Sequence, residues 1–207
     1  MDILSVFLLT LAVNIDTLKV SSANILYKAA FSKFKMLFIA VFTSIITFLS
    51  ICLGKIIDIY FTQNLSNILG IVLLGFIGVY YIVEHIRKEI NNAGYDTSYF
   101  VEDFSKHKNI IELGKIKDNS SMFKNLINFS FALSLNNIWP CIAGSLMGMG
   151  IGLIILLNFI ICISSFIVGP LIKGTSIINY IKSNHYLLSS ILLILLFIIQ
   201  ICIYLFK

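Results

Sequence analysis

Six long apolar stretches determine what this chain can fold into. A helix needs about 20 mostly apolar residues to cross a bilayer. Stretches of roughly that kind cover residues 3–26, 36–57, 67–83, 126–147, 151–172 and 186–206. Inside lipid the backbone must satisfy its own hydrogen bonds, and a helix does so within one segment. We therefore predict an all-α, multi-pass (polytopic) membrane protein whose main partner is the lipid bilayer.

The composition excludes a soluble enzyme. Of the 207 residues, 58% are hydrophobic and 12% are charged, whereas a soluble domain carries about twice that charge. The polar segments contain neither a phosphate-binding loop nor a nucleophile with a matching base. We predict no enzyme activity, no cofactor and no nucleic-acid partner, and the sequence leaves the oligomeric state open. The cysteines lie inside the apolar stretches without a metal-binding spacing, which indicates packing: Cys52, Cys141, Cys162 and Cys202.

Basic residues concentrate in every second loop. The loops after the first, third and fifth stretches hold nearly all of them, and the opposite side receives only Lys55 and Lys207. Cytoplasmic loops of membrane proteins are enriched in lysine and arginine. We therefore expect both termini outside and the long central loop in the cytoplasm.

The central loop divides the chain into a first unit (1–86), a linker (87–124) and a second unit (125–207). The loop mixes both charge signs and shows no helical period, which indicates a linker. A metal-loading patch is the alternative, formed by His85, His107, Glu102, Asp103 and Glu112. Their spacing fits no defined metal site, so we favour the linker.

The two units resemble each other at an offset of 120 residues. This shift superimposes the first three stretches on the last three and matches Ala12 with Ala132, Ala23 with Ala143, Ser44 with Ser164, Gly54 with Gly174, Tyr60 with Tyr180 and Asn64 with Asn184. An odd number of spans per unit makes the second unit enter the membrane from the opposite side. We therefore predict a 3+3 inverted repeat, an arrangement typical of transporters with a binding site near the midplane.

Asp16 is the main candidate for that binding site. A carboxylate in the middle of a membrane helix costs about 2.5–3.5 kcal/mol by insertion scales, so it usually has a partner or a function. At the same offset Asp16 matches Asn136, and Pro140 should free the Asn136 carbonyl from the helical hydrogen-bond ladder. Together with Asn14 and Asn137, these groups form a predicted oxygen-ligand site for a hard divalent cation such as Mg²⁺, Ca²⁺ or Mn²⁺.

Simpler interpretations stay open for each of these residues. Asp16 and Lys19 are three residues apart and could form a structural ion pair. The two asparagines could hydrogen-bond between helices, and Pro140 could be a packing kink. A lysine beside Asp16 would weaken divalent-cation binding unless it turns away, loses its proton or is displaced by the ion.

Two polar stripes accompany the predicted site. They run at helical spacing, over Thr43, Thr47, Ser50 and Gly54 in the second stretch and over Asn158, Cys162, Ser165 and Gly169 in the fifth. Such faces either pack helices together or line a route to the central site.

Residues 12–16 (Ala-Val-Asn-Ile-Asp) and 132–137 (Ala-Leu-Ser-Leu-Asn-Asn) resemble the paired motifs of the manganese efflux pump family. Members of that family carry an Ala-x-Ser-x-Asp type sequence in the first and fourth of six helices. The sequence is most similar to the sporulation membrane protein branch, found in spore-forming Firmicutes. Lys19, Asn136, Trp139 and Pro140 depart from the pattern of the pump proper, which has a second acid at position 136 and small or apolar residues at the others.

The resemblance implies a LysE-superfamily-like fold in the bacterial cell membrane and efflux of a divalent cation, typically manganese. It also implies that Asp16 is a metal ligand. The alternative within the same family is a non-transporting sporulation membrane protein that kept the fold and lost a complete metal site.

Overall fold

A computed structural model of the chain describes residues 3–22, 33–92, 119–172 and 175–206. Its helices are α1 (Ile3–Ser21), α3 (Lys33–Tyr60), α4 (Gln63–Asn92), α6 (Asn119–Leu146), α7 (Ile151–Leu171) and α8 (Ser176–Leu205). All six are long and apolar enough to cross a membrane. The prediction of an all-α chain is confirmed for the described residues, and its six helices have the length and hydropathy of membrane spans. Most of the linker lies outside the described residues.

Four helices, α3, α4, α6 and α8, extend beyond the apolar stretches that predicted them, and α4 and α8 do so the furthest. α4 continues at both ends of residues 67–83, and α8 begins ten residues before residue 186. Thr175 caps α8, because its side chain accepts a hydrogen bond from the Ile178 amide. Within α8 the backbone of Asn184 is non-helical, with φ −113° and ψ 23°, so two helical segments meet there.

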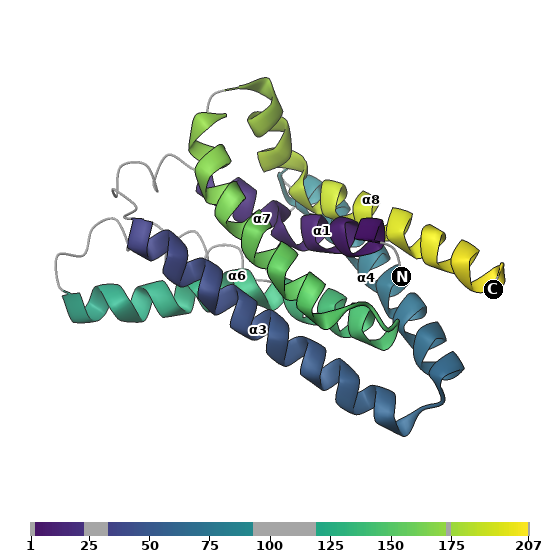
Figure 1. Cartoon of the computed structure of the whole chain (residues 1–207). Coiled ribbons are helices and arrows are strands. Elements are labelled where there is room, and N and C mark those ends of the chain that lie inside the picture. Colours follow the sequence, from purple (N-terminus) through teal and green to yellow (C-terminus); the bar gives the residue numbers. More distant parts are fainter. Residues whose placement is uncertain (1–2, 23–32, 93–118, 173–174, 207) are drawn as a thin grey trace.

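Successive helices alternate in direction along the bundle (Figure 1). The start of α1 and the end of α8 therefore lie at one end of the bundle, together with the short α3–α4 and α6–α7 turns. The other end receives the start of α3 and the end of α4, which contribute four basic residues: Lys33, Lys35, Arg87 and Lys88. The charge asymmetry seen in the sequence thus corresponds to two ends of one bundle.

The main helix contacts join the two units of the chain. α1 packs against α7 and α8, α3 packs against α6 and α7, and α4 packs against α6 and α8. Hydrogen bonds show that α1 runs parallel to α7, since Asn14 bonds Asn158 and Ser21 bonds Ser165, both 144 residues apart. α3 and α6 also run in the same direction (Figure 1), and the Ser145 hydroxyl donates to the Ile51 carbonyl at 2.9 Å.

Glycines bring these helices close together. A Cβ atom on Gly54 of α3 would lie 2.7 Å from the Ser145 Cβ and 2.9 Å from the Ile142 carbonyl oxygen. A Cβ on Gly169 of α7 would collide with Ser21 of α1. Small residues permit such backbone approaches in membrane helices. The glycines that end the two polar stripes are therefore packing positions.

The outer surface is apolar, as a bilayer requires. Phe76 is 71% exposed and Trp139 is 60% exposed, and many aliphatic side chains share this surface. By contrast, serine, threonine, asparagine and histidine side chains are buried between the helices. Polar side chains therefore gather in the interior of the bundle.

Candidate functional site

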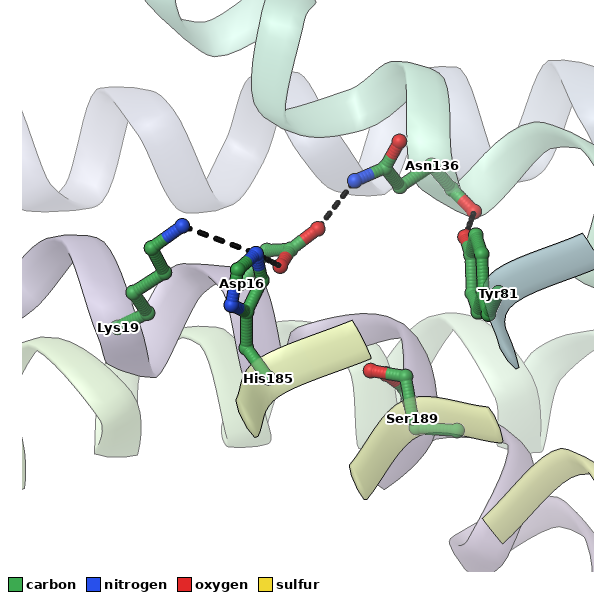
Figure 2. A network of polar contacts seen from close by, with 7 residues as sticks. Asp16, Lys19, Tyr81, Asn136, His185 and Ser189 are labelled. Atoms are coloured by element: carbon green, nitrogen blue, oxygen red, sulfur yellow. Dashed lines mark hydrogen bonds and ion pairs between the residues drawn. The ribbon is translucent and has the colours of Figure 1, made fainter. Parts of the chain in front are cut away.

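Asp16 and Asn136 meet in the interior of the bundle. The Asn136 Nδ2 donates a hydrogen bond to Asp16 Oδ2, which joins α1 to α6 across 120 residues of sequence (Figure 2). The Asp16 side chain remains 20% exposed. A hydrogen bond to a carboxylate offsets part of the cost of removing it from water. The two residues paired by the sequence offset are therefore direct neighbours.

Tyr81 supplies the hydrogen-bond donor that Pro140 lacks. Pro140 lies inside α6 and provides no N–H for the Asn136 carbonyl four residues earlier. The Tyr81 hydroxyl, from α4, lies 3.5 Å from that carbonyl oxygen and donates to it (Figure 2). The freed carbonyl thus has a partner on a neighbouring helix, as a membrane interior requires.

His185 is a member of the site that the sequence interpretation missed. Its Nε2 lies 3.9 Å from Asp16 Oδ1, and its side chain is 2% exposed. His185 directly follows the helix break at Asn184 in α8. One turn further along α8, the Ser189 hydroxyl donates to the Ala12 carbonyl at 3.1 Å and holds α8 against α1.

Lys19 lies beside the same imidazole. Its Nζ is 2.9 Å from His185 Nε2 (Figure 2). A contact of this length needs a proton between the two nitrogens, and the amine is the stronger base. We assign the shared proton to Lys19, as an ammonium that donates to the lone pair of His185 Nε2. Lys19, His185, Asp16, Asn136 and Tyr81 form one continuous group, called the central polar group below.

Asn14 belongs to a second hydrogen-bond network. Its Nδ2 donates to Asn158 Oδ1 at 2.8 Å, and Asn158 Nδ2 donates to Thr47 Oγ1 at 3.2 Å. One turn away, Thr43 Oγ1 lies 3.7 Å from Cys162 Sγ. The two polar stripes of the sequence therefore face each other and join α1, α7 and α3. These contacts favour their packing role over a route to the site.

Asn137 is the remaining residue of the predicted ligand set. Its side chain is 2% exposed, and its Oδ1 has no hydrogen-bond partner among the described residues. Of the predicted set, the structure brings Asp16 and Asn136 into contact and gives Asn14 other partners. The central polar group gains His185, Lys19 and Tyr81 instead.

The chemistry available in the central polar group is mixed. It offers one carboxylate, one imidazole, one amide and one ammonium. The described residues contain no group of three or more histidine, cysteine or acidic side chains that could hold a metal. Of the alternative loop patch, His85 lies 3.8 Å from Glu89 within α4, and its other members lie outside the described residues.

Comparison with known proteins gives no relative: no protein-family model, no curated protein and no solved structure matches the chain. The chemistry of the central polar group is therefore the basis for any function assigned to the protein.

Proposed function

We propose that this protein is a small membrane carrier that exports a divalent cation of the manganese type, with Asp16 as its principal ligand. The contact between Asp16 and Asn136 is the observation that supports the proposal. A carboxylate in the interior of a helix bundle is by default a candidate ion-binding group in a membrane protein. Its partial exposure leaves it accessible to an ion that enters the bundle.

The pairing of the helices supports an inverted repeat in this proposal. The first helix of each unit runs parallel to the second helix of the other unit, as α1 with α7 and α3 with α6. Each residue at the centre also contacts the third helix of the other unit: Asp16 meets His185 of α8, and Asn136 meets Tyr81 of α4. Rocking of one unit against the other would then open the site to alternate sides.

The basic end of the bundle supports the proposed orientation. Lysine and arginine gather at the end where α3 begins and α4 ends, and such residues favour the cytoplasmic side. We therefore propose that both termini lie outside and that the linker is cytoplasmic. In this orientation the Asp16 carboxylate would receive its ion from the cytoplasm for export.

Flux through purified protein tests the proposal. The full chain is reconstituted in liposomes that enclose a manganese-quenched dye, and Asp16→Asn is compared with the parent. Asp58→Asn is the matched control, because Asp58 pairs with Lys55 at 3.5 Å near the end of α3, away from the central polar group. We expect flux in the parent and the control and a loss of at least about tenfold in Asp16→Asn, because the site loses its charge.

One observation favours the alternative of a non-transporting sporulation membrane protein. Both Asp16 oxygens already have a neighbour inside the bundle, an amide and an imidazole. The carboxylate would then be structural. Absence of flux in the parent, no protection of a manganese-sensitive host, and rescue of a spore defect by Asp16→Asn would together support this function and reject transport.

A further inference from the structure

We infer that Lys19 is a tethered counter-cation, which the transported ion displaces from His185, and that His185 then becomes a ligand. The ion class is therefore a divalent transition metal rather than Mg²⁺ or Ca²⁺. This inference rests on the proposed transport function and names a ligand and a selectivity beyond it.

His185 Nε2 is the point where the lysine and the carboxylate meet. The nitrogen lies 2.9 Å from Lys19 Nζ and 3.9 Å from Asp16 Oδ1. The lone pair that accepts a proton from the ammonium is the same lone pair that would bind a metal. The Lys19 ammonium therefore occupies the position that a metal ion would take beside Asp16. Lys19 must leave His185 when a metal ion binds there.

The imidazole determines which ions fit. Mg²⁺ and Ca²⁺ take oxygen ligands, whereas Mn²⁺, Fe²⁺, Co²⁺ and Zn²⁺ also accept imidazole nitrogen. The site would offer a mixed set of ligands: the Asp16 carboxylate, the His185 imidazole and the Asn136 amide oxygen. The amide oxygen would face the ion after the Asn136 amide group rotates by about half a turn. Such a set favours transition metals over the alkaline-earth ions.

The length and position of Lys19 permit its displacement. Lys19 lies in the last turn of α1, and its side chain is half-buried. A lysine stem is long and flexible, so the ammonium can move towards the end of the helix. Repulsion by an arriving divalent ion would drive that movement.

A tethered ammonium also explains how an empty carrier could return. Without it, the negative charge of Asp16 would have no positive counterpart inside the bundle while the units rearrange, which is costly in a membrane. The Lys19 ammonium neutralises that charge in the unloaded state. Net transport therefore needs Lys19, whereas exchange of one bound ion for another does not.

The first test separates net flux from exchange in liposomes that contain Lys19→Met. Removal of the competing charge should lower the KM for Mn²⁺ about tenfold, while net flux falls and Mn²⁺/Mn²⁺ exchange persists. Lys55→Met is the matched control, because it removes an exposed lysine of α3. Lys19→Arg keeps the charge and should retain net flux. Equal effects of Lys19→Met on exchange and net flux, with unchanged KM, would overturn the inference.

The second test measures selectivity in His185→Gln. We expect about tenfold weaker competition by Zn²⁺ and Mn²⁺, with little change for Ca²⁺, because glutamine offers no imidazole nitrogen. His85→Gln is the matched control, since His85 is also buried but pairs with Glu89 within α4. If the parent transports Mn²⁺ and His185→Gln keeps its selectivity, the inference fails alone. If the parent transports no divalent cation, the proposed function fails with it.

Discussion

Asp16 is stabilised by neighbours of different chemistry. An amide donates to one carboxylate oxygen, and an imidazole that holds a lysine ammonium lies near the other. Each neighbour offsets part of the cost of about 2.5–3.5 kcal/mol for a carboxylate at this depth. These contacts explain how the carboxylate is accommodated inside the bundle.

Asn136→Asp should make stability depend on the metal. A second carboxylate in contact with Asp16 replaces a hydrogen bond with a like-charge repulsion of about 2–4 kcal/mol. We expect a lower unfolding temperature in detergent at neutral pH without metal, and recovery on addition of Mn²⁺. Asn128→Asp, at an exposed position of the same helix, is the control. If Asn136→Asp and the parent have the same unfolding temperature in the absence of metal, residue 136 does not contact Asp16.

The sequence allowed part of the central polar group to be predicted. The offset of 120 residues paired Asp16 with Asn136, and these two residues are in contact in the structure. His185 was missed because the predicted span began at residue 186, one residue beyond it. Apolar stretches do not include a polar residue at a helix break, so hydropathy gave no signal for it.

Pro140 of α6 creates a need for a hydrogen-bond donor, which α4 of the first unit supplies. Pro140 removes the helical donor to the Asn136 carbonyl, and Tyr81 of α4 replaces it. The site residue Asn136 is thereby held by its backbone as well as by its side chain. Pro140 and Tyr81 together therefore help to position the side chain that contacts Asp16.

A double-mutant cycle over Tyr81 and Pro140 tests this coupling. Tyr81→Phe alone should lower the free energy of unfolding by about 0.5–1.5 kcal/mol, because a buried carbonyl loses its donor. In the Pro140→Ala background the alanine N–H can serve Asn136, so the same change should cost less. Equal costs in both backgrounds, measured by unfolding in detergent, would show that Tyr81 and Pro140 are independent.

The contact between α3 and α6 depends on Gly54. A methyl group there would lie 2.9 Å from the Ile142 carbonyl oxygen, which belongs to rigid helix backbone. Gly54→Ala should therefore destabilise the protein by about 1–3 kcal/mol. Gly152→Ala is the matched control, since nothing lies within 4 Å of its added Cβ. Thermal unfolding of both variants in one detergent gives the comparison, and equal midpoints would contradict the close approach.

Across the whole molecule, the number of spans was easier to predict than their contacts. Six apolar stretches predicted six helices, because a helix satisfies its backbone hydrogen bonds within one segment in lipid. Hydropathy does not indicate which helices contact each other. The parallel pairing of α1 with α7 and of α3 with α6 was therefore not predicted. Those contacts follow from glycines and hydrogen-bonding side chains that are specific to each helix face.

The orientation of the bundle can be tested by labelling one exposed residue at each end. Thr62 lies in the α3–α4 turn, at the end that holds the start of α1, and Ser176 begins α8 at the opposite end. Each is changed to cysteine in a background where Cys52, Cys141, Cys162 and Cys202 are replaced by alanine.

The positive-inside rule predicts that the basic end faces the cytoplasm, so an impermeant maleimide should label Thr62→Cys in intact cells. Ser176→Cys should react only after the membrane is permeabilised. The reverse pattern would invert the bundle and overturn the proposed orientation. Labelling of both positions in intact cells would contradict the alternation of the helices itself.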